Sequence, residues 1–224
     1  MLEELQNNID FFIRNKTKFS RKNFVETNPK ILEQIKQENL YTQDVLEQFF
    51  KKRSLDFLRV LDIGAKNWFY AKGEHDYFSQ FCNNFIMDGV ELDAYRLYYN
   101  FYSRFEVAKF YTKGLDNTNY IPSNLLDLNQ KYDYIIWFLP FVFIEPLKKW
   151  GLPKKHFQPQ KLLNHAYKLL NQNGQMLIIN QGEIESFEQQ KLLEELEINY
   201  DYKGEVLSKH FSYKNKRYAY LITK

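Results

Sequence analysis

The chain has 224 residues, 44% hydrophobic and 18% aromatic, so it can bury one substantial core, and this composition excludes an intrinsically disordered protein. Its net charge of +3, from 31 basic and 28 acidic side chains, is too small to demand nucleic acid or an anionic membrane as a partner. The single cysteine, Cys82, excludes an intrachain disulfide and a cysteine-built zinc site. We expect a cytoplasmic protein with no membrane partner, because no signal peptide opens the chain and Pro140 interrupts its longest apolar run.

Residues 1 to about 55 are polar, helix-periodic and free of glycine. The pair Asn28-Pro29 supplies an N-cap followed by proline at the first helical position, which predicts a helix from this point. A basic cluster precedes it, and is either a solvated segment or a patch for phosphate or an acidic partner. Its members are Arg14, Lys16, Lys18, Arg21 and Lys22.

From Leu58 onward, short apolar segments alternate with helical ones, which is typical of an α/β domain. The predicted strands cover residues 58–63, 85–92, about 119–123, 132–138 and 176–180. The predicted helices cover 93–113, a segment that begins at Gln158-Pro159 and ends at Asn173-Gly174, and 183–196. Two final segments, 199–207 and 217–223, alternate like the arms of an antiparallel hairpin.

Two strand ends carry the strongest functional signal. The first strand runs into Gly64 at a tight strand-to-helix turn, where backbone N–H groups can approach a ligand. The second strand ends at Glu91, and a carboxylate in that position can accept both hydroxyls of a ribose. If the two strands are parallel neighbours joined by a crossover helix, Gly64 and Glu91 meet at one edge of the sheet.

Taken together, the order of elements over about residues 40–224 resembles the class I S-adenosylmethionine-dependent methyltransferases. The segments that carry the resemblance are Asp62-Ile63-Gly64-Ala65, Gly89-Val90-Glu91, Asn124-Leu125-Leu126, Tyr132-Asp133-Tyr134-Ile135-Ile136 and 169–179. The resemblance implies a three-layer α/β fold with a Rossmann-like, seven-stranded, mostly parallel sheet whose last strand is antiparallel. It places an N-terminal helical extension at 1–55 and the methyltransferase domain at 56–224.

The resemblance also implies a binding site for S-adenosyl-L-methionine around the first loop. Gly64, Ala65 and Lys66 would line its methionine end, and Asp62 would orient the loop or take the amino group. The family repeats glycine at alternate positions of this loop, whereas here Lys66 and Trp68 replace the second and third glycines. Lys66 either points its cation at the cofactor carboxylate or reaches solvent.

On the nucleoside side, the resemblance implies that Glu91 accepts the ribose hydroxyls and that Leu92 packs on the adenine. Asn124, followed by Leu125, would offer its amide to the adenine edge. Asp116 is a rival for that role, because the third strand is hard to locate in the sequence.

Trp137 and Phe138 end the fourth strand, where relatives hold the reacting sulfonium. An aromatic face near a cation is favourable by ~0.5 to 2 kcal/mol, although core packing explains both residues equally well. The aromatic run 138–143 and the loop 150–153 are suited to form the walls of a pocket for an apolar or planar substrate. His156 is a candidate base, but a lone loop histidine is more often solvated; catalytic residues are otherwise unassigned, and no metal-ligand spacing occurs.

We therefore expect a methyltransferase that uses S-adenosyl-L-methionine, with a small-molecule acceptor favoured. Two alternatives stay open. The replaced glycines suit a non-enzymatic relative that keeps the fold as a binding module. The N-terminal basic cluster, together with later cations, suits an RNA methyltransferase. These later cations are Lys209, Lys214, Lys216 and Arg217. The sequence specifies neither the acceptor nor the oligomeric state.

Overall fold

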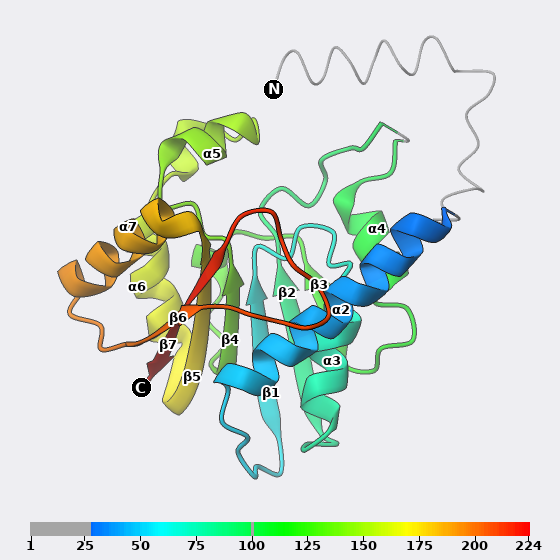
Figure 1. Ribbon diagram of the computed structural model, residues 1–224, viewed down its shortest axis with the longest axis horizontal. Coiled ribbons are helices and arrows are strands. Elements are labelled where there is room, and N and C mark those ends of the chain that lie inside the picture. Colours follow the sequence, from blue (N-terminus) through cyan, green and yellow to red (C-terminus); the bar gives the residue numbers. More distant parts are fainter. Residues whose placement is uncertain (1–27, 100) are drawn as a thin grey trace.

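The computed structural model describes residues 28–99 and 101–224, so the basic cluster at 14–22 lies outside the described part. A seven-stranded sheet in the order β3-β2-β1-β4-β5-β7-β6 forms the centre of the molecule (Figure 1). Its strands are β1 (Leu58–Ile63), β2 (Phe85–Val90), β3 (Thr118–Ile121), β4 (Tyr132–Phe138), β5 (Leu170–Gln181), β6 (Asp201–Glu205) and β7 (Arg217–Thr223). β7 pairs antiparallel with β5 and β6, and the other pairs are parallel, which confirms the predicted α/β sheet.

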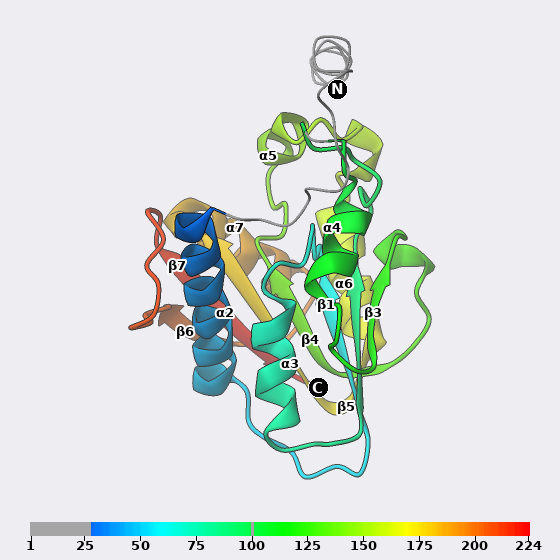
Figure 2. The same ribbon diagram turned by 90° about the vertical axis from the view of Figure 1, so that its right-hand side faces the viewer.

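Helices cover both faces of the sheet. They are α2 (Pro29–Phe49), α3 (Ala71–Ser79), α4 (Arg104–Tyr111), α5 (Ile144–Lys149), α6 (Pro159–Leu169) and α7 (Gly182–Glu195), with 3₁₀ turns η2 (Leu125–Asp127) and η3 (Lys154–His156). Figure 2 shows α2 and α3 on the same side of the sheet, where a core of aromatic and aliphatic side chains joins them to it. A second core joins α6 and α7 to the opposite face, which completes three layers. Across the described residues, no helix combines the length and apolarity that crossing a bilayer requires.

Helix α2 begins where its N-cap predicts and is fixed to the chain that follows β1. The Asn28 side chain accepts a hydrogen bond from the Lys30 backbone N–H at 3.0 Å. Further along the helix, the Asn39 amide donates to the Phe69 carbonyl at 2.9 Å and its oxygen accepts from the Gly73 N–H at 2.7 Å. One side chain therefore satisfies backbone groups at the start of α3 and holds α2 beside the loop after β1.

The predicted helix over residues 93–113 is wrong in its first half, because α4 begins only at Arg104. A capping box fixes this start: Ser103 Oγ accepts from the Glu106 N–H at 3.2 Å, and the Glu106 carboxylate accepts from the Ser103 N–H at 2.9 Å. The Asp93 carboxylate binds Arg104 at 3.3 Å and so holds the preceding segment in a loop. Helical spacing of apolar residues alone did not reveal this competing ionic contact.

Boundaries at β5 also differ from the prediction. Helix α6 ends at Leu169 instead of at Asn173-Gly174, and β5 already begins at Leu170. Gly174 packs tightly, because a Cβ there would lie 2.9 Å from the Leu170 side chain. The glycine therefore serves close packing within an extended segment and does not end a helix.

Gly89 of β2 faces the indole of Trp68, which is fully buried. A Cβ at position 89 would lie 2.7 Å from the indole ring. We therefore expect Gly89→Ala to destabilise the protein by about 1–3 kcal/mol, because the indole must shift within a packed core. Urea unfolding of Gly89→Ala, Trp68→Phe and the double variant measures this effect. The smaller ring should make the double variant more stable than the two single losses predict, and strictly additive losses would contradict the contact.

Candidate functional site

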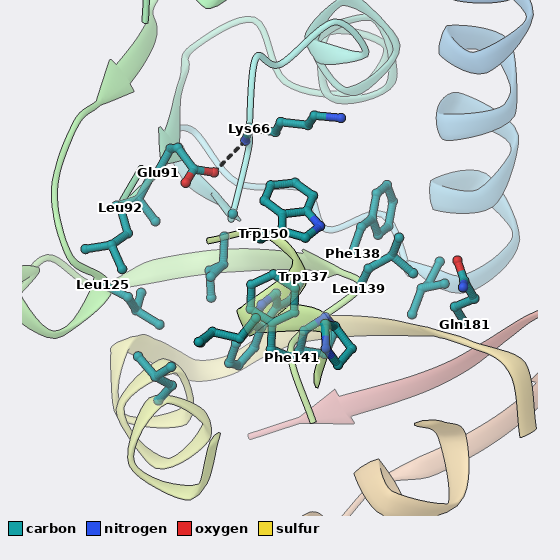
Figure 3. Close-up of a pocket in the computed structure, with 18 of the residues that line it drawn as sticks. Lys66, Glu91, Leu92, Leu125, Trp137, Phe138, Leu139, Phe141, Trp150 and Gln181 are labelled. Atoms are coloured by element: carbon teal, nitrogen blue, oxygen red, sulfur yellow. Dashed lines mark hydrogen bonds between the residues drawn. The ribbon is translucent and has the colours of Figure 1, made fainter. Parts of the chain in front are cut away.

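The order in which the chain adds strands to the sheet reverses between β1 and β4. From β1 the chain continues to β2 and β3 on one side, whereas β5, β7 and β6 follow β4 on the other. In open α/β sheets, ligands bind outside the carboxyl ends of the strands at such a switch point. A cavity of about 1060 Å³ opens here, which is at the upper end of typical small-molecule sites (Figure 3).

The loop after β1 forms one wall of the cavity. The N–H groups of Gly64 and Ala65 both donate to the Val90 carbonyl, at 2.9 and 3.2 Å, and so tie the bend to the end of β2. Gly64, Lys66 and Trp68 have φ angles of 76°, 55° and 47°. The loop thus keeps left-handed backbone at all three positions where the family repeats glycine. At the two substituted positions this geometry costs on the order of 1–3 kcal/mol each, which surrounding contacts must offset.

The two substituted side chains take different directions. The Trp68 indole points into the core, where its Nε1 donates to Glu74 Oε2 at 2.8 Å and its ring packs near Tyr120. Lys66 lines the cavity, while its backbone carbonyl accepts a hydrogen bond from the Tyr120 hydroxyl. The tryptophan therefore leaves the crevice open, and the lysine adds a cation to it.

Glu91 lies directly against this loop. Its Oε2 accepts from the Lys66 N–H at 2.8 Å, and its Oε1 accepts from the Asp93 N–H at 2.8 Å, with Arg104 at 3.7 Å from Oε1 (Figure 3). The bend at Gly64 and the Glu91 carboxylate thus meet at the carboxyl ends of β1 and β2, as the sequence predicts. Each carboxylate oxygen still has lone-pair capacity for a further donor.

Five other predicted residues line the same cavity: Leu92, Asn124, Leu125, Trp137 and Phe138. Asn124 Oδ1 accepts from the Leu126 N–H at 3.0 Å and caps η2, and the Asn124 amide nitrogen has no hydrogen-bond partner among the described residues. Asp116, the rival to Asn124, precedes β3 and so lies toward the opposite edge of the sheet. The structure therefore favours Asn124 as the polar residue at this end.

Asp62, at the end of β1, and Ala65, within the loop, do not line the cavity; both are fully buried. Asp62 Oδ2 accepts from the Tyr70 hydroxyl at 2.8 Å, and Tyr70 does line the cavity. Burial raises the pKa of Asp62 to about 7 and also raises the pKa of the neighbouring Glu74. Asp62 therefore acts on the cavity through the tyrosine that it holds.

Trp150, Lys66 and Arg104 lie together over Glu91. The sequence did not predict this cluster. Trp150, just after α5, places its ring centroid 4.5 Å from Arg104 Cζ and 5.4 Å from Lys66 Nζ. Figure 3 shows the indole in the hollow between Glu91 and Phe138. The Lys66 ammonium has no ion pair within 4 Å in the described chain, and burial lowers its pKa. The capping box at Ser103 was the one sequence signal that could have located Arg104.

The far end of the cavity is built from α2, α7, the end of β5 and the start of β7. Its polar lining residues are Gln34, Glu38, Tyr41, Thr42, Gln181, Glu185, Gln189, Tyr213 and Arg217. His156, the candidate base, also lines the cavity. No group of three or more His, Cys, Asp or Glu side chains in the described residues is placed to hold a metal ion.

The sequence matches no family model and no curated protein sequence. Its fold, by contrast, is similar to solved structures. A S-adenosylmethionine-dependent methyltransferase from Aquifex aeolicus superposes with a TM-score of 0.57 at 16% identity, over 85% of this chain and 96% of that one. Precorrin-6y C5,15-methyltransferase from Geobacter metallireducens gives 0.53 at 13% identity, over 93% and 95%. Magnesium protoporphyrin IX methyltransferase from Synechocystis, with bound S-adenosylmethionine, gives 0.51 at 12% identity, over 97% of each chain. The chain therefore has the class I methyltransferase fold.

The buried acid gives a testable pH dependence. Because the pKa of Asp62 is about 7 in the folded protein against an ordinary 3.8, the folded state holds this proton more tightly than the unfolded state. The contribution of Asp62 to stability therefore falls as pH rises from 3.8 to about 7 and is constant above that window. Asp62→Asn keeps an acceptor for Tyr70 and removes the ionisation. We expect its unfolding free energy to rise relative to the native protein through this window, whereas parallel pH profiles would contradict the assignment.

Proposed function

We propose that the protein is a cytoplasmic S-adenosylmethionine-dependent methyltransferase with a small-molecule acceptor. The observation that carries the proposal is the contact between the Gly64 bend and Glu91 at the switch point of a sheet with the class I methyltransferase fold. The cofactor supplies a methyl group already activated on a sulfonium. The protein's own part is therefore largely binding and orientation of the two reactants.

The residues around the bend fit this cofactor. A Cβ at Gly64 would meet nothing within 4 Å, so the backbone there faces open space. Glu91 has lone pairs left to accept the two ribose hydroxyls, and the Asn124 amide nitrogen is free to donate to the adenine edge. Leu92 and Leu125 supply the apolar surfaces that would pack against the base.

Lys66 suits the carboxylate of the methionine part. Its ammonium lies in the cavity, without an ion pair among the described residues, on the loop that would hold this end of the cofactor. Trp137 and Phe138, at the end of β4, line the cavity where the methyl group would be presented. In this proposal the nucleoside lies on the β2 side of the cavity, and the far end is left for the acceptor.

Neither alternative gains a specific observation from the described residues. For an RNA substrate, Lys216 is paired with Glu205 at 2.7 Å, and Arg217 lines the cavity. For a non-enzymatic binding module, the replaced glycines are the motive, yet the loop keeps its left-handed backbone and an open crevice. A small-molecule methyltransferase is therefore the proposal that the geometry supports best.

Calorimetric titration with S-adenosylhomocysteine tests the proposal. We expect binding that Glu91→Gln weakens by about tenfold or more, because a neutral amide accepts hydrogen bonds from the ribose more weakly than a carboxylate. Glu188→Gln is the matched control, since this glutamate on α7 pairs with Lys191 away from the cavity and should leave affinity unchanged. No binding at millimolar ligand, or equal affinity in Glu91→Gln and native protein, would contradict the proposal.

The role of Lys66 has its own test. Lys66→Met should weaken S-adenosylhomocysteine binding by about fivefold to tenfold through the lost charge-assisted contact. It should leave 5′-methylthioadenosine, which lacks the amino-acid part, unaffected. Lys72→Met on α3, where the lysine pairs with Asp76, is the control. Equal effects on both ligands would show that Lys66 does not contact the carboxylate.

A further inference from the structure

Arg217 stands at the far end of the cavity, at the first residue of β7. Across the β5–β7 ladder it lies opposite Gln181, and its NH1 donates to Gln181 Oε1 at 2.6 Å. The guanidinium also lies over the Tyr213 ring, 4.5 Å from its centroid. Arg217, Tyr41 and Tyr213 also line a smaller hollow, whereas Gln181 lines only the large cavity. The hydrogen bond to Gln181 therefore directs NH1 toward the large cavity.

This guanidinium has no ion pair within 4 Å in the described chain. Glu38 and Glu185 act on it electrostatically, but each accepts hydrogen bonds from other groups. The two oxygens of Glu38 accept from the Gln34 amide at 2.7 Å and the Tyr213 hydroxyl at 2.9 Å, and Glu185 accepts from the Gln181 N–H at 3.2 Å. A half-buried planar cation with unused donors is suited to a carboxylate.

Two further unpaired donors belong to residues that line the same cavity. The Tyr41 hydroxyl and the Gln189 amide nitrogen are buried without hydrogen-bond partners, and both residues line the cavity. The Tyr41 hydroxyl interacts electrostatically with Arg217, so the two lie in one neighbourhood. Buried donors that lack acceptors are costly, and a ligand rich in acceptor atoms removes that cost.

The sheet register sets the scale of the acceptor. Phe138 of β4 pairs with Ile179 of β5, and Ile179 pairs with Ala219 of β7. Arg217 lies two residues beyond Ala219, so its backbone is two strand spacings across and two residues along from Phe138, ~12 Å from the end of β4, where the methyl group would be presented. Phe138, at the β4 end of this span, supplies an aromatic wall. That span accommodates one aromatic ring with its substituents.

We propose that the acceptor is a compact aromatic carboxylic acid whose carboxylate binds Arg217 beside the Tyr41 hydroxyl. This inference rests on the proposed function. The ring lies against Phe138, which leaves the group to be methylated near the end of β4. Arg217 is then a specificity-determining residue.

Binding of 4-hydroxybenzoate and its neutral amide, 4-hydroxybenzamide, to the full chain tests this inference. Ligand-observed NMR with and without S-adenosylhomocysteine should show that the acid binds at least about tenfold more tightly than the amide. Arg217→Gln should abolish this preference, and Arg217→Lys should keep a weaker one, because it retains the charge without the planar fork. Lys216→Gln, which alters the exposed neighbour that pairs with Glu205, should keep the full preference.

Equal affinities for the acid and the amide, no binding of either probe at millimolar concentration, or an acid preference that survives in Arg217→Gln would each overturn the inference. If Arg217→Gln does not fold, as judged by circular dichroism, an undiminished preference in Arg217→Lys would overturn it instead. Binding of S-adenosylhomocysteine without an acid preference defeats this inference alone. An acid preference without S-adenosylhomocysteine binding defeats the proposed function and leaves the carboxylate site standing.

Discussion

The hydrogen bond from the Lys66 N–H to the Glu91 carboxylate is the contact on which the site depends. It joins the loop after β1 to the end of β2, next to the bonds from Gly64 and Ala65 to the Val90 carbonyl. Because Glu91 is almost fully buried, its carboxylate needs the N–H donors of Lys66 and Asp93, together with Arg104, to offset its desolvation. The loop, the acid and the N-terminus of α4 therefore hold one another in place at the switch point.

Lys66 and Trp68 show how large side chains are accommodated in a loop where the family repeats glycine. The backbone at Lys66 and Trp68 stays left-handed, and the indole turns into the core beneath β2. The space it needs there is supplied by Gly89, whose missing Cβ would otherwise collide with the ring. The indole at position 68 therefore depends on the absence of a side chain at position 89 of the neighbouring strand, while the crevice stays open.

Sequence patterns located β4, β7 and the meeting of Gly64 with Glu91, because these depend on local apolar runs and on the register of neighbouring parallel strands. They failed for residues 93–103, where a capping box and an ionic contact override helical periodicity. Sequence patterns also did not predict that Trp150 packs on Arg104 or that Arg217 donates a hydrogen bond to Gln181, since both contacts join segments far apart in the chain. Side-chain partners across elements are tertiary facts that periodicity does not encode.

The cavity thus has two chemically different ends, an acid and an amide beside β2 and β3, and a guanidinium with unused donors beside β7. The most direct measurement of the account is a crystal structure of the protein with S-adenosylhomocysteine. The account predicts both ribose hydroxyls within hydrogen-bond reach of Glu91 and the homocysteine part along Gly64. A nucleoside bound elsewhere, or a Glu91 carboxylate that contacts only Lys66, Asp93 and Arg104 in the complex, would contradict it.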